Sequence, residues 1–185
     1  MSEYSALSPE TKPKLRKMTK TRLQNIALYY LERFDSSAFN LRKVLEQRLI
    51  KYSFEVPDFN LNEAKTWIDE IISYFEKYGY INDDRYAEIK INNYLLAGKP
   101  TRYIQQKMQQ KGISEDVVNK ILQSRNVDES EMALNFAAKK KIGPFRPEEN
   151  RKQSSQKDLA TLVRAGFSYD IAKEIIFAEN IDDFS

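Results

Sequence analysis

The stretch KYGYINDDRYAEIK, residues 77–90, decides how the chain is built. Its adjacent acids, Asp83 and Asp84, suit either a pair of catalytic carboxylates or the start of a helix. Gly79 stands where a left-handed residue ends the preceding helix, and Asn82 stands where the next helix needs an N-cap. Acids in a first helical turn are typical of capping and of the helix dipole. The stretch therefore predicts a joint between two helices.

Helical spacing of apolar residues continues on both sides of this joint and predicts an all-α protein. The first helix is expected to begin after Thr21, and no segment shows the alternation of a strand. The other expected N-caps are Ser36 or Ser37, Asn62, Thr101, Ser114, Asp128 and Ser168. Residues 1–20 are expected to form a flexible basic lead-in, and residues 146–157 a polar, charged loop.

An internal repeat groups these helices. GISEDVVNKIL (112–122) and GFSYDIAKEII (166–176) share Gly, Ser, Asp and Ile in place, and WIDEII (67–72) matches the apolar positions of VVNKIL (117–122). Periods of this length are typical of repeat proteins. We therefore predict three tandem three-helix repeats, over residues 21–80, 81–126 and 127–185. Such repeats lean on one another and form an elongated, curved array.

The residue types exclude most catalytic chemistry. The chain has no cysteine and no histidine, so it lacks thiol nucleophiles and the usual general base. It also lacks a glycine-rich phosphate cradle. Asp69, Glu70, Asp83 and Asp84 are the acids that could form an oxygen-only magnesium site, but three of the four fit caps or solvated helix faces better. We expect no enzyme activity, no cofactor and no metal.

Charge is distributed unevenly, although 30 basic and 27 acidic residues give a net charge of only +3. Basic residues cluster over 12–22 and 139–157, which suits either a polyanionic partner or solvated tails and loops. No apolar stretch is long enough to cross a membrane, and the N-terminus lacks the apolar core of a signal peptide. A cytoplasmic protein without membrane contact is expected.

The segment TRYIQQKMQQKG, residues 101–112, leaves two interpretations open. Its arginine and glutamines are types that read base edges in the DNA major groove, and a three-helix unit is the shape of helix-turn-helix proteins. The alternative is a helix with a narrow buried stripe and a polar back. Tyr94 and Tyr103 beside it could stack on bases or fill a protein pocket.

Three motifs in order resemble one known family. They are GYINDDRYAE (79–88), TRYIQQKMQQKGIS (101–114) and LATLVRAGFSYDIAKEII (159–176). Together they are similar to the motifs of the RecX family, regulators of the bacterial recombinase RecA. The chain departs from the family pattern at Asn82, Met108 and Ala165, where Asp, Leu and a basic residue are usual.

The resemblance implies a non-enzymatic, cytoplasmic protein of homologous recombination, DNA repair and the SOS response. Such proteins bind in the groove of the RecA–single-stranded DNA filament and limit its ATPase, strand-exchange and coprotease activities. Single- or double-stranded DNA is a further possible partner, and a monomer is expected. The alternative is a helical protein that binds DNA directly, without a recombinase partner.

Site residues follow from charge and expected exposure. The expected contacts with the partner or DNA are Lys99, Arg102, Lys107, Lys111, Lys139, Lys140, Lys141, Arg146 and Arg151. The motif residues expected to be structural are Gly79, Tyr80, Asp83, Asp84, Arg85, Gly112, Gly166 and Phe167.

Overall fold

Helices and the turns between them make up residues 16–178, the part of the chain that the computed structural model describes. The helices are α1 (Lys20–Leu31), α2 (Ala38–Glu55), α3 (Leu61–Lys77), α4 (Asp83–Leu96), α5 (Thr101–Gln109), α6 (Glu115–Ser124), α7 (Glu129–Lys140), α8 (Glu148–Ala165) and α9 (Tyr169–Phe177), with a short 3₁₀ helix, η1 (Gly143–Phe145). No strand occurs in this part, so the predicted all-α class is confirmed. None of its helices combines the length and apolar character that crossing a membrane requires.

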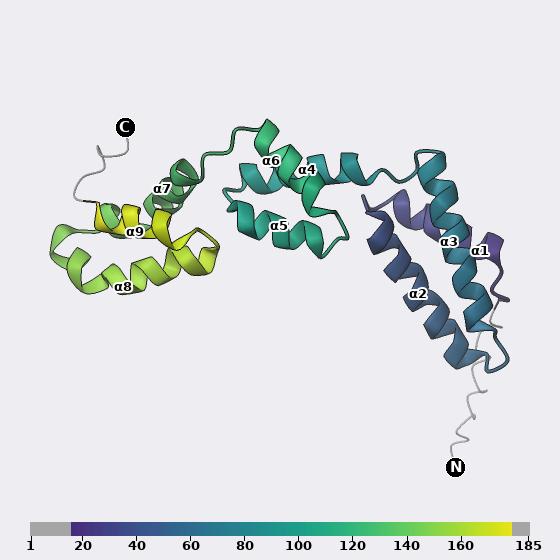
Figure 1. Cartoon of the computed structure of the whole chain (residues 1–185). Coiled ribbons are helices and arrows are strands. Elements are labelled where there is room, and N and C mark those ends of the chain that lie inside the picture. Colours follow the sequence, from purple (N-terminus) through teal and green to yellow (C-terminus); the bar gives the residue numbers. More distant parts are fainter. Residues whose placement is uncertain (1–15, 179–185) are drawn as a thin grey trace, which may run out of the picture.

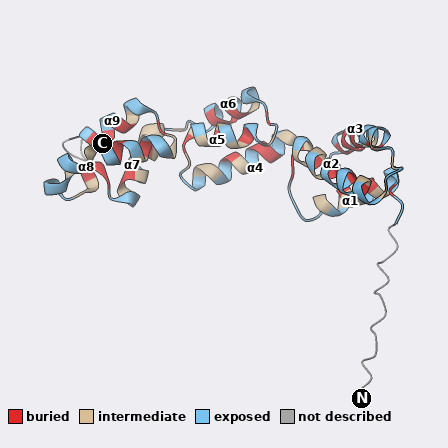
Figure 2. Cartoon of the chain, turned by 90° about the horizontal axis from the view of Figure 1, so that it is seen from below, coloured by how far each residue is buried: buried red, intermediate tan, exposed pale blue. Residues whose placement is uncertain are grey.

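The helices lie in a row of three groups, α1–α3, α4–α6 and α7–α9, and the row bends at the middle group (Figure 1). Each group buries its own apolar cluster, built around Leu45 and Phe75 in the first, Ile91 and Met108 in the second, and Leu162 in the third. Figure 2 shows that all three groups contain buried residues on their helices. The predicted elongated, curved array of three-helix repeats is confirmed.

Side-chain caps start most of the helices. The predicted caps Ser37, Asn82, Ser114, Asp128 and Ser168 each accept a hydrogen bond from a backbone N–H in the first turn, and these predictions are confirmed. The predicted caps Thr21 and Asn62 are wrong, because Thr19 and Asn60, two residues earlier in each case, cap those helices. Thr101 was also wrong. Pro100 precedes α5, and the Thr101 hydroxyl instead bonds to Glu129.

The end of the expected lead-in is packed rather than free. Met18 is 5% exposed and belongs to the first cluster, and its backbone N–H donates to the Tyr52 hydroxyl over 3.1 Å. The remainder of that lead-in, residues 1–15, lies outside the described residues.

Residues 146–157, predicted to form a loop, mostly belong to the 18-residue helix α8. The prediction failed because the first half of α8 contributes no residue to the apolar cluster of the third group. Leu159 and Leu162, in the second half, are the residues of α8 in that cluster. Glu148 and Glu149 in the first turn favour the helix through its dipole.

Candidate partner-binding surface

The first junction between repeats joins the start of α2 to the second repeat. The Ser37 hydroxyl donates to the Lys111 carbonyl over 2.6 Å, and the Ala38 N–H donates to Asp83 Oδ1 over 2.8 Å. Burial disfavours the charged form of Asp83 and raises its pKa. The hydrogen bond from Ala38 lowers this pKa, the negative charge of Asp84 raises it, and the net shift is upward. Asp83 therefore links two repeats as well as starting α4.

A close backbone approach completes this junction. Gly112 has φ +76°, and a Cβ added there would lie 2.6 Å from Phe39 Cγ. Lys111 beside it donates from Nζ to Asn40 Oδ1 over 3.3 Å. Both Lys111 and Gly112 therefore belong to the first junction. A hollow of only about 90 Å³ remains there, between the end of α1 and the start of α4.

The second junction is held at two points. Glu129, in the first turn of α7, accepts hydrogen bonds from the Thr101 N–H, over 3.1 Å, and from the Thr101 hydroxyl. At the other point Gly166 has φ +114°, and a Cβ there would lie 3.6 Å from Pro100 Cγ. The start of α5 thus contacts the third repeat twice, at the first turn of α7 and at the turn between α8 and α9.

A cleft of about 780 Å³ opens beside these two points, between the α4–α5 turn and helices α7 and α8. Four cations and no acid line it, and we call it the basic cleft; its cations are Lys99, Lys139, Lys140 and Arg164. Its apolar wall consists mainly of Leu95, Leu96, Tyr103, Met132 and Phe136. Leu96 is 80% exposed and adds apolar surface beside the cations of the cleft.

Two of the lysines lie over aromatic rings of the basic cleft. Lys99 Nζ is 5.2 Å from the centroid of the Tyr103 ring, and Lys140 Nζ is 5.9 Å from that of Phe136. Both distances are within the range of a cation–π contact. Aromatic edges hold the rings in turn, since Tyr94 packs on Tyr103 and Phe167 on Phe136. The arrangement positions positive charge above apolar surface and suits an acidic ligand with apolar groups.

The basic cleft brings together Lys99, Lys139 and Lys140 from the predicted contact set, but not the other members. Lys107 lies beside it, with Nζ 5.6 Å from the Tyr103 ring. Lys141 is exposed at the left-handed C-cap of α7 and does not line the cleft. Arg102 lines a separate hollow of about 420 Å³ on α5 and α6, with glutamines 105, 106 and 109.

Arg146 and Arg151 hold the turn after α7. Arg146 donates from Nε to Asp158 Oδ2 over 2.9 Å and from its terminal nitrogen to Oδ1 over 2.8 Å, and the Gly143 N–H also donates to Oδ2. Arg151 donates to the carbonyls of Arg146 and Pro144. Both arginines therefore have structural partners, and we leave them out of the surface proposed below.

The Asp158 carboxylate at the centre of this network is 1% exposed. Burial alone would raise its pKa, but the hydrogen bonds from Arg146 and Gly143, with the charges of Arg146 and Lys157, outweigh burial and lower it. The same Asp158 hydrogen bond raises the pKa of the Arg146 guanidinium. The pair is ionised and well satisfied.

The motif residues occupy turns and packing positions. Gly79 has φ +74° at the end of α3, and Phe167 is 1% exposed. Tyr80 is 51% exposed and stacks beside Tyr74, while Asp84 and Arg85 are exposed in the first turn of α4.

The acids weighed for a magnesium site are kept apart. Asp69 pairs with Arg42 over 2.6 Å, Glu70 pairs with Lys20, and Asp83 accepts from Ala38. Across residues 16–178 no three acidic side chains come together in a group that could hold a metal ion.

Sequence reasoning missed Arg164, the fourth cation of the basic cleft. It lies in the motif LVRAGF, two residues before the left-handed Gly166, where a cation favours the end of a helix.

These features define a helical-repeat protein that carries a basic, aromatic-lined cleft between two of its repeats. A family model described as "RecX, second three-helix domain" matches residues 82–122, which correspond to α4–α6. The regulatory protein RecX of Myxococcus xanthus is 36% identical over 164 residues, which cover 87% of each chain. The chain belongs to the RecX family of regulatory proteins, as its motifs predicted.

More distant relatives agree. The regulatory protein RecX of Agrobacterium fabrum is 28% identical over 83% of this chain and 80% of its own. The crystal structure of RecX from Lactobacillus salivarius superposes with a TM-score of 0.59 at 25% identity, covering 85% of this chain and 94% of that one. A second crystal structure of a regulatory protein RecX, 22% identical with a TM-score of 0.61, shares the fold.

Proposed function

We propose that this protein regulates the recombinase RecA without being an enzyme itself. It binds in the groove of the RecA–single-stranded DNA filament in the cytoplasm and limits ATPase, strand exchange and coprotease activity. The observation that carries the proposal is the basic cleft, an acid-free hollow with four cations, on a chain of the RecX family.

The shape of the molecule supports a partner with repeating subunits. Three groups of helices lie in a row, so they offer separate contact surfaces along the length of the molecule (Figure 1). A filament presents equivalent sites at regular intervals. Several weak contacts made together raise the overall affinity well above that of any one of them.

The chemistry of the basic cleft supports an acidic ligand. Lys139 and Lys140 are exposed, and Lys99 is partly so. Carboxylates of a filament subunit or phosphates of its DNA would pair with them, and Leu96 with Tyr103 would contact adjoining apolar groups. Binding that depends on such charges weakens as salt is added.

The direct test is the single-stranded-DNA-dependent ATPase of RecA, measured while this protein is added in substoichiometric amounts. We expect inhibition, because one chain that spans neighbouring subunits affects more than one active site. A pull-down with RecA, with and without single-stranded DNA, should show retention chiefly when the filament is present. Unchanged ATPase at equimolar protein would contradict the proposal.

A second candidate is direct DNA binding without a recombinase partner. The hollow that Arg102 shares with three glutamines on α5 and α6 favours it, because these side chains can reach base edges or phosphates. DNA affinity that falls steeply with salt, together with no retention on RecA filaments, would support this candidate over the first.

A further inference from the structure

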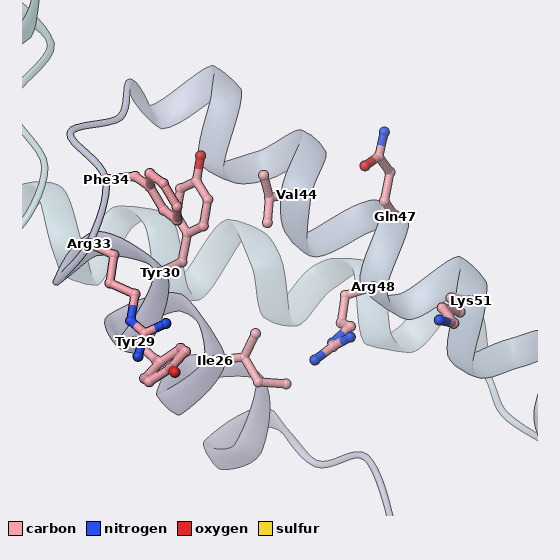
Figure 3. A pocket seen from close by; sticks show the side chains of 9 residues that line it. All are labelled: Ile26, Tyr29, Tyr30, Arg33, Phe34, Val44, Gln47, Arg48 and Lys51. Carbon is pink, nitrogen blue, oxygen red and sulfur yellow. The ribbon is translucent and has the colours of Figure 1, made fainter.

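A second groove with apolar and cationic walls lies at the opposite end of the molecule, between α1 and α2. Its volume is about 380 Å³, and Figure 3 shows the side chains around it. They are Ile26, Tyr29, Tyr30, Arg33, Phe34, Val44, Gln47, Arg48 and Lys51. The set contains three cations and no acid. We call it the α1–α2 groove.

The groove has a firm aromatic end and a basic end. Tyr30 packs against Phe34 with ring centroids 5.1 Å apart, and its hydroxyl accepts a hydrogen bond from Asn40 over 3.0 Å. In Figure 3 Arg48 extends from α2 toward α1, and Lys51 lies farther along α2 from that aromatic end. Apolar groups would therefore bind at one end and carboxylates at the other.

Two of the three cations of the groove, Arg48 and Lys51, are available for a ligand. The ion pairs found within residues 16–178 are those of Lys20, Arg42 and Arg146, so none of them neutralises Arg48 or Lys51. Tyr29 and Phe34 are each 55% exposed, and Arg33 lies 4.1 Å above the Tyr29 ring. Leaving two aromatic rings this exposed costs solvation free energy that a bound apolar group would recover.

The chain itself contains a segment of complementary chemistry. Residues 179–185, outside the described part, have the sequence ENIDDFS, with three acids and the apolar residues Ile181 and Phe184. We propose that the α1–α2 groove of one copy binds segment 179–185 of a second copy. Acids 182 and 183 pair with Arg48 and Lys51, and an apolar side chain of the segment contacts Tyr30 and Phe34.

The arrangement of the repeats points to a second copy rather than to the same chain. The α1–α2 groove and the end of α9 lie at opposite ends of the row, with the second repeat between them (Figure 1). Seven residues reach at most about 25 Å even when fully extended. The second repeat therefore lies between the end of α9 and the groove of the same chain (Figure 1).

Such a contact is head-to-tail, so each copy offers one groove and one segment and a row of copies can grow without closing. The surface is small, and small interfaces are weak. Dilute chains therefore stay monomeric, as the sequence predicts, and associate when they are concentrated. The contact does not require RecA. If the proposed function also holds, copies lined along a filament would bind cooperatively.

The test is a charge exchange on the full-length chain, followed by sedimentation equilibrium at low salt. Wild type should self-associate, and both Arg48→Glu with Lys51→Glu and Asp182→Lys with Asp183→Lys should weaken association by about tenfold or more, as expected for reversing two ion pairs. A chain that carries all four changes should recover to within about threefold of wild type, because the pairs are re-formed with opposite signs.

A peptide measurement needs no variant of the protein. Free peptide ENIDDFS should dissociate the wild-type chains, and the control peptide ENIKKFS should not. Lack of self-association by wild type, association unaffected by the groove changes, or failure of the four-change chain to recover would each overturn the proposal. Loss of oligothymidine binding by Arg48→Glu with Lys51→Glu, with self-association unchanged, would also overturn it and assign the groove to nucleic acid. Far-ultraviolet circular dichroism checks that every variant keeps its helices.

Discussion

The two junctions between successive repeats are built from similar turns but leave different surfaces. At the first, Ser37 and Asp83 bond across the boundary, and Phe39 packs against the backbone of Gly112. At the second, the Thr101–Glu129 link and the Gly166 contact lie beside an open cleft of about 780 Å³. At the first junction the polar groups bond one repeat to the next. At the second junction four cations line a cleft that contains no acid to pair with them.

The difference teaches where to look for a partner site in an array of this kind. A basic residue at the first junction, such as Lys111, has its carbonyl and its ammonium group bonded to the neighbouring repeat. Basic residues at the open junction, such as Lys139 and Lys140, project from the end of α7 into the basic cleft. These lysines are the same residue type in the sequence, and the packing around each junction decides whether the side chain bonds to a neighbouring repeat or faces an open cleft.

The largest expected effect breaks the first junction. Gly112→Ala should lower the free energy of unfolding by roughly 3 kcal/mol, because the new Cβ overlaps Phe39 and the backbone is left-handed. Gly98→Ala is the matched control. Gly98 is also left-handed at φ +66° but has open space around it, so about 1 kcal/mol is expected. Equal losses in urea denaturation would show that the junction is not tightly packed.

The second effect concerns Asp158, which holds the turn between α7 and α8, the two helices that form one side of the basic cleft. Asp158→Ala removes the acceptor of the buried Gly143 N–H and should cost roughly 2 kcal/mol at neutral pH. The pKa of Asp158 is lowered on folding, so its contribution is present above the ordinary value of 3.8 and is lost as pH falls through the lowered pKa. Urea denaturation should show wild type and variant converging in strong acid. A constant difference at all pH values would contradict the role of the ionised carboxylate.

The third effect concerns binding and leaves the fold intact. Lys139→Glu with Lys140→Glu should weaken filament binding about tenfold, since two charges of the basic cleft are reversed. Lys141→Glu with Lys152→Glu is the matched control, because it changes the net charge equally at exposed positions outside the cleft lining. The affinity of each variant for the filament is measured by the fluorescence anisotropy of labelled single-stranded DNA coated with RecA. Equal weakening would mean that overall charge, rather than the cleft, drives binding.

The smallest effect has the opposite pH dependence. The pKa of Asp83 is raised on folding by burial, so the folded state holds this proton more tightly than the unfolded state does. The stability that Asp83 contributes is therefore present below its ordinary value of 3.8 and falls as pH rises through the raised pKa. Asp83→Asn keeps an acceptor for Ala38 and should change stability at neutral pH by less than about 1 kcal/mol. In urea denaturation the Asp83→Asn variant should therefore lose stability more steeply than wild type as pH falls through the acid range. A shallower loss than in wild type would mean that the pKa of Asp83 is lowered, not raised, on folding.

The sequence was sufficient for the repeat architecture because caps and left-handed glycines are local signals. Asn82 and Ser114 start their helices as predicted, and Gly79 ends α3 with a positive φ. Helix α8 was missed where it has no apolar periodicity. Its first half is stabilised by groups that the sequence does not bring together, chiefly Arg146 and Asp158.

The candidate site was only partly predictable for a related reason. Charge and expected exposure indicated Lys99, Lys139 and Lys140, but nothing in the chain order says that two segments 40 residues apart face one cleft. Arg146 met the same criteria as these lysines, charge and expected exposure, yet its guanidinium is bound to Asp158. The α1–α2 groove was missed because its residues alternate with core positions along two helices.

The three separate apolar clusters have a consequence for how the molecule comes apart. Chains whose units contact only their neighbours unfold piecewise, so heating should produce overlapping transitions rather than one cooperative melt. A terminal unit could then be lost while the middle one persists. A ligand seated in the basic cleft would protect amide hydrogens of the second and third units from exchange and leave those of the first almost unchanged.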